Sequence, residues 1–196
     1  MPRLFTGLEI PEAQSIYLAD LRGSLYGARW IDPENYHITL RFIGDIDRRI
    51  ARDIENTLGE IMRDPLEITL TDLGIFGGEK PHAIIASVKP TRALLELQHE
   101  HERIMREIGL PKEARKFTPH VTLARLRGTG VMDVVAYLSS RQAFHVQSFT
   151  AYNFALYSAK PSTGGGPYVV EASYPLGEDM PDMNEKDWMR SYAPAK

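Results

Sequence analysis

Several residue types and patterns are missing or scarce in this 196-residue chain, and each absence excludes a class of function. There is no cysteine, which excludes disulfide bonds, a thiolate nucleophile and cysteine-ligated zinc. No run of 18 apolar residues occurs, so we expect no membrane-spanning helix. The net charge of −3 argues against a surface that is basic throughout, so a nucleic acid would have to bind through a local patch.

Signals for export and for a nucleotide-binding loop are missing as well. The N-terminus lacks a charged segment followed by an apolar one, and with the absence of cysteine this favours a cytoplasmic protein. Gly164-Gly165-Gly166 has strand-like sequence on both sides and no lysine-serine pair after it. It therefore differs from a strand–glycine–helix phosphate loop, and we expect a connection between two strands.

Apolar periodicity predicts a mixture of strands and helices. We expect strands over residues 2–10, 28–31, 36–43, 66–76, 82–88, 118–124, 144–157 and 168–174, and helices from Pro11 to near Gly27 and over residues 47–63, 92–108 and 131–139. This order describes two related halves, and we expect residues 1–176 to form one domain. Residues 177–196 lack apolar periodicity, which predicts a loosely packed or disordered tail.

The clearest motif in the chain occurs twice, 83 residues apart. Its copies are His37-Ile38-Thr39-Leu40 and His120-Val121-Thr122-Leu123. Successive side chains of a strand point to opposite faces. Each copy therefore presents an imidazole and a hydroxyl on one face and two aliphatic side chains, suited to a core, on the other.

Two histidines paired in this way point to acid–base chemistry. A single His-x-Thr is most often a strand histidine with a local hydrogen bond, but two copies supply both a general acid and a general base near neutral pH. In-line displacement at phosphorus is the natural reaction for such a pair, in which one histidine activates water and the other protonates the leaving oxygen. The threonine hydroxyls Thr39 and Thr122 can donate hydrogen bonds to phosphate oxygens, and the chemistry requires neither a metal nor a cofactor.

Residues around the two motifs carry a resemblance to a known family. They are Arg29-Trp30, Pro33-Glu34-Asn35-Tyr36-His37-Ile38-Thr39-Leu40-Arg41-Phe42-Ile43-Gly44 and Phe117-Thr118-Pro119-His120-Val121-Thr122-Leu123-Ala124-Arg125. They resemble the 2H phosphoesterase superfamily, and within it the bacterial and archaeal RNA 2′,3′-cyclic phosphodiesterases, which are also called 2′-5′ RNA ligases. Arg3-Leu4-Phe5-Thr6-Gly7-Leu8-Glu9-Ile10-Pro11, Leu156-Tyr157-Ser158 and Gly166-Pro167-Tyr168 fit as well, so the resemblance spans about residues 2–176.

The resemblance implies an α+β fold with two pseudo-symmetric lobes, each an antiparallel sheet with outer helices, and an active-site cleft between the sheets. It implies hydrolysis of RNA 2′,3′-cyclic phosphate ends to 2′-phosphates by a monomer, with reverse 2′-5′ ligation. By the same analogy His37 is the proton donor and His120 the proton acceptor, although the nearly symmetric motifs leave this direction open. Two alternatives remain: a binder of phosphorylated RNA ends without turnover, and a 2H phosphodiesterase that acts on a small cyclic nucleotide.

Two arginines near the motifs are candidate phosphate ligands. Arg41 follows Thr39 by two residues and in a regular strand shares the face of His37. Arg125 has the opposite parity, and it reaches the cleft only if the strand ends or bulges after Leu123. The resemblance implies that it does.

Other polar and aromatic residues have two interpretations each. Phe5, Tyr36, Tyr157 and Tyr168 could stack on a base, although core packing is favoured for each of them. Arg115 and Lys116 either steer RNA phosphates or belong to a solvated loop. The other histidines, His82, His99, His101 and His145, lack the spacing of a metal site and are expected to be structural or at the surface.

Overall fold

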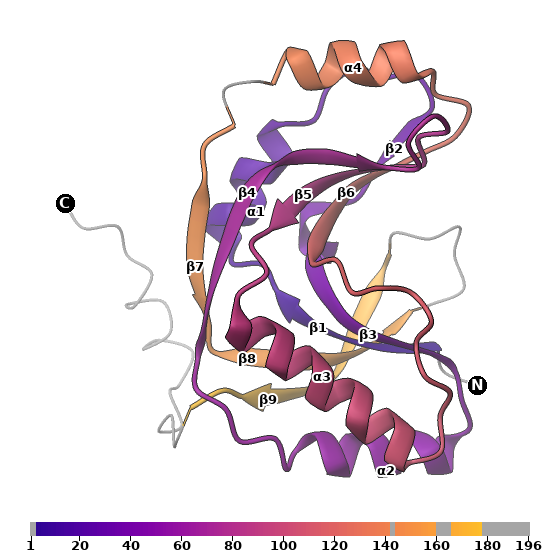
Figure 1. Ribbon diagram of the computed structural model, residues 1–196, viewed down its shortest axis with the longest axis vertical. Helices are drawn as coiled ribbons and strands as arrows, with labels where there is room; N and C mark the ends of the chain where they lie inside the picture. Colours follow the sequence, from indigo (N-terminus) through magenta and orange to yellow (C-terminus); the bar gives the residue numbers. More distant parts are fainter. Residues whose placement is uncertain (1–2, 142–143, 160–165, 178–196) are drawn as a thin grey trace, which may run out of the picture.

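The computed structural model describes residues 3–141, 144–159 and 166–177 (Figure 1). The strands are β1 (Arg3–Glu9), β2 (Ala28–Trp30), β3 (His37–Asp45), β4 (Leu66–Phe76), β5 (Ala83–Val88), β6 (His120–Leu126), β7 (Gln147–Ala151), β8 (Asn153–Ala159) and β9 (Tyr168–Pro175). The helices are α1 (Glu12–Asp20), α2 (Arg48–Leu58), α3 (Arg92–Glu107) and α4 (Val131–Ser139), with a 3-10 turn, η1, at Pro33–Asn35. The tail predicted over residues 177–196 lies, from residue 178 on, outside the described residues.

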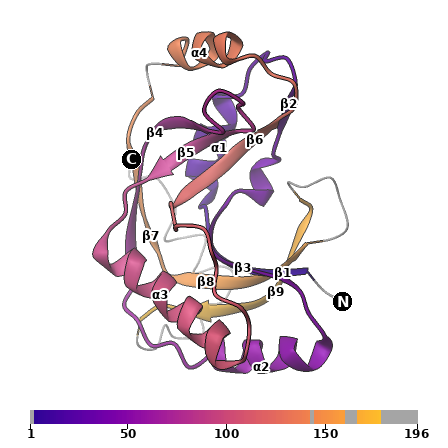
Figure 2. The same ribbon diagram turned by 45° about the vertical axis from the view of Figure 1, so that its right-hand side comes forward.

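The strands form two antiparallel half-sheets that meet at the two motif strands. The strand order is β7-β4-β5-β6-β3-β1-β8-β9, and β2 pairs with β6. The only residue pair recorded between β3 and β6 in the described chain is Ile38 with Val121. We call β3-β1-β8-β9 the first half-sheet and β6-β5-β4-β7 the second. The predicted α+β fold with two sheets is confirmed, and the two sheets are joined at one point and splay apart from it (Figure 2).

One extended segment serves both half-sheets. The sequence predicts a single strand over residues 144–157, and this is wrong, because the chain breaks at Tyr152 into β7 and β8. β7 pairs with β4, and β8 pairs with β1 and β9. The two strands are adjacent in the sequence but lie far apart in the strand order, so the sheet as a whole must be strongly curved.

Helix α1 ends seven residues before the predicted Gly27, and contacts with a distant segment explain why. The carbonyl of Leu21 accepts hydrogen bonds from Tyr137 Oη at 2.8 Å and Arg141 Nε at 3.1 Å, and the carbonyl of Arg22 accepts one from Arg141 Nη2 at 3.1 Å. These carbonyls would otherwise accept from the next helical turn. Tertiary contacts therefore replace the bonds that would have continued the helix.

The apolar faces of both motif strands lie in the core. Ile38, Leu40, Val121 and Leu123 are between 0% and 2% exposed. Helix α3 packs against β3, and Thr91 caps its N-terminus by accepting a hydrogen bond from the backbone N–H of Leu94. Within the described part of the chain, no helix combines the length and the apolar character needed to cross a membrane.

Candidate active site

The polar faces of the two motif strands open into one cleft. Its volume is about 920 Å³, and His37, Thr39, His120 and Thr122 all line it. Because β3 and β6 run antiparallel through the pair Ile38–Val121, Thr39 lies toward His120 and Thr122 toward His37. The two halves thus bring both predicted His-Thr pairs to one site.

A backbone carbonyl fixes each imidazole in the same way. His37 Nδ1 lies 2.8 Å from the carbonyl oxygen of Asn35, and His120 Nδ1 lies 2.7 Å from that of Thr118. A carbonyl can only accept a hydrogen bond, so Nδ1 carries the proton in both rings. Nε2 is therefore the atom of each ring that can exchange a proton in the cleft. In the neutral ring, His37 Nε2 accepts from Thr39 Oγ1 at 3.1 Å.

Aromatic rings hold each histidine from the side. The ring of His37 lies 4.8 Å from that of Phe5 and 5.0 Å, edge-on, from that of Tyr168. The ring of His120 meets that of Phe76 edge-on at 4.6 Å. Such packing restricts the rotation of both imidazoles.

Of the four aromatic residues considered for base stacking, three are buried. Phe5, Tyr36 and Tyr157 are 3%, 4% and 6% exposed, so the favoured interpretation of core packing is confirmed for them. Phe5 stacks on Tyr157 with the ring centroids 4.9 Å apart. Tyr168 is half-buried and lines the cleft.

The surroundings favour neutral imidazoles. The pKa of His37 is lowered from 6.5 to about 4, mainly by burial, with the positive charges of His120 and Arg125 acting in the same direction and the hydrogen bond to Asn35 acting against them. Burial also lowers the pKa of His120, and Arg125 acts on it in the same direction. A cation near both rings therefore makes protonation harder at each of them until an anion binds.

A bulge in each motif strand decides which following side chains face the cleft. In β6, Thr122 pairs with Ile85 and Ala124 with Ile84, so Leu123 is an extra residue. Ala124 is consequently buried, and Arg125 is exposed and lines the cleft. The predicted departure from a regular strand, expected after Leu123, is confirmed, and the extra residue is Leu123 itself.

A bulge of the same kind in β3 places the side chain of Arg41 in a buried position instead of beside His37 and Thr39. Thr39 pairs with Gly7 and Arg41 with Thr6, which makes Leu40 the extra residue. The expectation that Arg41 shares the face of His37 is therefore wrong. Its side chain is 6% exposed at the edge of the cleft, and its guanidinium donates to Glu102 at 2.5 Å, to the carbonyl of Pro111 at 2.6 Å and to the carbonyl of Phe42.

Two residues of the site, Phe42 and Asn35, were not singled out from the sequence, and a third, His82, was expected only to be structural or at the surface. The bulge in β3 leaves Phe42 42% exposed in the cleft, and His82, directly before β5, also lines it. Asn35 holds His37 through its carbonyl and accepts the backbone N–H of Tyr168 through Oδ1 at 3.0 Å. A Cβ on Gly166, where φ is +97°, would lie 2.5 Å from Asn35 Oδ1, so glycine permits this contact.

The remaining histidines are scattered. His101 is completely buried in α3, whereas His99 and His145 are exposed. The described ranges contain no cluster of three or more histidine, aspartate and glutamate side chains that could hold a metal ion. The interpretation of His101 as structural agrees with its burial, while the position of His82 in the cleft was not expected.

Several proteins are similar to this chain in sequence, and two of them illustrate the extent of the similarity. The chain is 36% identical to an RNA 2′,3′-cyclic phosphodiesterase of Aeropyrum pernix over 117 residues, which cover 57% of this chain and 66% of the relative, slightly less than two thirds. It is 33% identical to a protein of the same name from Bacillus subtilis over 130 residues, covering 63% of this chain and 71% of the relative.

Solved structures share the fold. TT0787 of Thermus thermophilus superposes with a TM-score of 0.74 at 21% identity, covering 89% of this chain and 97% of that one. E. coli LigT in complex with 3′-AMP gives a TM-score of 0.69 at 21% identity, covering 91% and 100%. The model of the family described as LigT like phosphoesterase matches twice, at residues 8–86 and 85–168, one match for each motif. With two matches that together span most of its length, the chain belongs to the LigT-like phosphoesterase family.

Proposed function

We propose that the protein hydrolyses RNA 2′,3′-cyclic phosphate ends to 2′-phosphates with His37 as proton donor and His120 as proton acceptor. The observation that carries the proposal is that the two imidazole rings have the same hydrogen-bonding arrangement. Each has Nδ1 committed to a backbone carbonyl and Nε2 left for the cleft. Several relatives bear the name of this activity, which supports the choice of substrate.

The proposed reaction is a single in-line displacement. His120 Nε2 takes a proton from water as the water oxygen attacks phosphorus. The bond from phosphorus to the 3′ oxygen breaks, and the Nε2 proton of His37 passes to that oxygen, which leaves the phosphate on the 2′ oxygen. Thr39 and Thr122 donate hydrogen bonds to the non-bridging oxygens, and Arg125 balances their charge. With a 5′-hydroxyl end in place of water as the nucleophile, the same forward steps join two RNA ends through a 2′-5′ phosphodiester bond.

Protonation of His37 is coupled to substrate binding in this mechanism. Burial holds the pKa of the empty site's His37 at about 4, so the ring is neutral near pH 7. A cyclic phosphate carries one negative charge, and its arrival between the rings favours the imidazolium. The acid is therefore formed where and when the leaving oxygen is in place.

The first test uses purified protein, EDTA and a short RNA with a 2′,3′-cyclic phosphate end. We expect a 2′-phosphate product, identified against 2′- and 3′-phosphate standards. The His37→Ala and His120→Ala variants should each lose roughly 10²–10⁴-fold in rate. His145→Ala is the control, since His145 is exposed and outside the cleft.

Other outcomes of this test select the other interpretations. A 3′-phosphate product would exchange the roles of the two histidines. Turnover of 2′,3′-cyclic mononucleotides but not of RNA would favour the small-nucleotide alternative. Binding of the RNA end without turnover at any pH would favour the binding protein, and full activity in His120→Ala would contradict the mechanism.

A further inference from the structure

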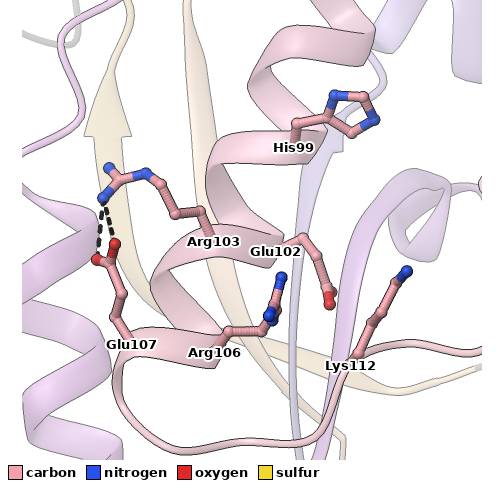
Figure 3. Close-up of a pocket in the computed structure, with 6 residues that line it drawn as sticks. All are labelled: His99, Glu102, Arg103, Arg106, Glu107 and Lys112. Carbon is pink, nitrogen blue, oxygen red and sulfur yellow. Dashed lines mark hydrogen bonds and ion pairs between the residues drawn. The ribbon is translucent and has the colours of Figure 1, made fainter.

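A second hollow lies on α3, outside the cleft. Its volume is about 590 Å³, and its lining comes from the C-terminal half of α3 and from the loop that follows: His99, Glu102, Arg103, Arg106, Glu107 and Lys112. Figure 3 shows Arg106, Glu102 and Lys112 directed toward the same space, while Arg103 turns away to Glu107. We call this hollow the α3 groove.

The acidic side chains of the α3 groove are already occupied. Glu107 accepts two hydrogen bonds from Arg103 at 2.8 and 2.9 Å. Glu102 binds the buried Arg41 at 2.5 Å and also accepts the backbone N–H of Glu113 at 3.2 Å. Arg106 and Lys112 are exposed and form no ion pair within residues 3–141, 144–159 and 166–177. The groove therefore presents two unneutralised positive charges.

In the catalytic cleft, by contrast, most of the basic side chains form ion pairs with acidic ones. Arg3 pairs with Asp45, Arg41 with Glu102, and Arg115 with Glu113, whose pKa the Arg115 guanidinium lowers to about 2. Among the cleft-lining arginines and lysines that the structure describes, this leaves Arg125 beside the two histidines and Lys116 at the rim.

The loop between α3 and β6, residues 108–119, connects these charges. Lys116 lines the cleft, and Lys112, four residues earlier on this loop, lines the α3 groove. The loop is held against the body of the protein by the bond of Arg41 to the carbonyl of Pro111 and by that of Glu113 to Glu102. The loop thus carries basic side chains from one hollow to the other, and we call Lys116, Lys112 and Arg106 the basic track.

We infer that the α3 groove binds the phosphodiester backbone of the RNA strand on the 5′ side of the reacting end. This inference rests on the proposed function. A 2′,3′-cyclic phosphate terminates a strand, so the rest of the RNA must leave the cleft over its rim. The strand passes Lys116, crosses the α3–β6 loop and meets Lys112 and Arg106, which contact phosphates and not bases. With a net charge of −3, the chain binds RNA only through such a local track.

The test compares substrates that differ in length. An RNA of about 12 nucleotides has a strand that extends beyond the cleft, whereas a 2′,3′-cyclic mononucleotide has no strand to place in the α3 groove. We expect the double variant Arg106→Ala/Lys112→Ala to lose about tenfold in kcat/KM on the longer RNA and to keep its kcat/KM on the mononucleotide. The salt dependence of binding to the longer RNA should weaken by a slope of about 1.4, since each phosphate contact on a single strand contributes about 0.7.

A matched control removes the same charge elsewhere. Arg49 and Arg127 are both exposed, and neither lines the cleft or the α3 groove. The variant Arg49→Ala/Arg127→Ala should behave as the original protein on both substrates. Equal kcat/KM of original protein and Arg106→Ala/Lys112→Ala on the longer RNA would overturn the inference, as would an equal loss on both substrates.

A binding measurement keeps the result independent of turnover. Fluorescence anisotropy with a labelled RNA of about 12 nucleotides that ends in a 2′-phosphate reports affinity even if no substrate is hydrolysed. We expect a Kd about tenfold weaker for Arg106→Ala/Lys112→Ala than for the original protein. Absence of turnover with this difference present would reject the proposed function alone, whereas an unchanged Kd would reject the α3 groove as the binding surface.

Discussion

Phe42 and Arg125 occupy equivalent positions in the two halves of the molecule. Each follows its motif histidine by five residues, and each reaches the cleft because a bulge, at Leu40 or Leu123, interrupts its strand. One half therefore offers the cleft a phenyl ring and the other a guanidinium. This difference breaks the near symmetry of the two His-Thr pairs. For the proposed function, we expect the phosphate to bind toward Arg125 and the nucleoside toward Phe42.

The first prediction concerns the charge of Arg125. Its proximity lowers the pKa of both His37 and His120, after the larger effect of burial. We expect a bell-shaped pH profile of kcat/KM for the original protein, with both limbs at or below the ordinary histidine pKa of 6.5. In Arg125→Met, loss of the positive charge should raise both pKa values and move both limbs to higher pH, while kcat/KM at the optimum falls roughly 10²-fold.

A control separates this effect from a general loss of positive charge. Lys116 also lines the cleft, but it does not contribute to the pKa shift of either histidine. The pH limbs of Lys116→Met should stay in place. Limbs that do not move in Arg125→Met would show that its guanidinium does not act on the histidines.

The second prediction concerns the ring of Phe42. It is 42% exposed in the cleft, and we expect a base of the substrate to stack on it, a contact worth roughly 1–3 kcal/mol in single-stranded nucleic acid complexes. Phe42→Ala should raise KM about tenfold and change kcat little, and Phe42→Tyr should restore KM. Steady-state kinetics with a cyclic phosphate on an abasic ribose supplies the check, because its KM should be the same in all three proteins.

How far the sequence predicts this site depends on the bulges. The alternation of apolar and polar residues correctly predicts the orientation of His37, Thr39, His120 and Thr122, since all four precede the bulges. Directly after the bulges, the alternation no longer predicts which face of the strand a side chain occupies. It placed Arg41 on the cleft side and gave no reason to consider Phe42, because a bulge depends on how the neighbouring strand pairs and leaves no local mark in the sequence.

Other features depend on contacts between distant residues. The end of α1 is determined by Tyr137 and Arg141, more than 100 residues away, and the break at Tyr152 by a change of partner strand. The position of His82 in the cleft follows from the pairing of β5 with β6. Periodicity is a local signal, and none of these partners can be identified from it.

The third prediction tests the corrected role of Arg41. The side chain of Arg41 is 6% exposed, and that of its partner Glu102 is 16% exposed. Arg41 connects β3 to α3 through Glu102 and to the α3–β6 loop through the carbonyl of Pro111. Arg41→Met should lower the free energy of unfolding by about 3–5 kcal/mol, because Glu102 is left without its charged partner. Urea denaturation measures this loss. The double variant Arg41→Met/Glu102→Leu should recover most of it, and its KM on a 2′,3′-cyclic mononucleotide, which does not reach the α3 groove, should stay within about twofold of the original. A large rise in KM with unchanged stability would restore Arg41 as a phosphate ligand.

The fourth prediction concerns acid stability and the buried His101. Burial lowers the pKa of His101 from 6.5 to about 3, and its Nδ1 bonds Thr6 Oγ1 at 2.8 Å while Nε2 has no partner in the described structure. Above pH 6.5 the ring is neutral in both the folded and the unfolded chain, so it adds no pH dependence there. Below that pH the unfolded chain binds the proton first, and the free energy of unfolding falls by about 1.4 kcal/mol per pH unit until the folded pKa is reached.

The variant His101→Gln removes the titrating group and keeps an amide that can donate to Thr6 Oγ1. Stability measured by urea denaturation at about pH 7 and about pH 5 should therefore fall less steeply in His101→Gln than in the original protein, by about 2 kcal/mol over this interval. His37, whose pKa is also lowered, titrates equally in both proteins and cancels in the difference. His145→Gln, at an exposed position, should retain the original slope. Parallel acid dependence of His101→Gln and the original protein would mean that His101 is already protonated in the folded state, which its enclosed Nε2 makes costly.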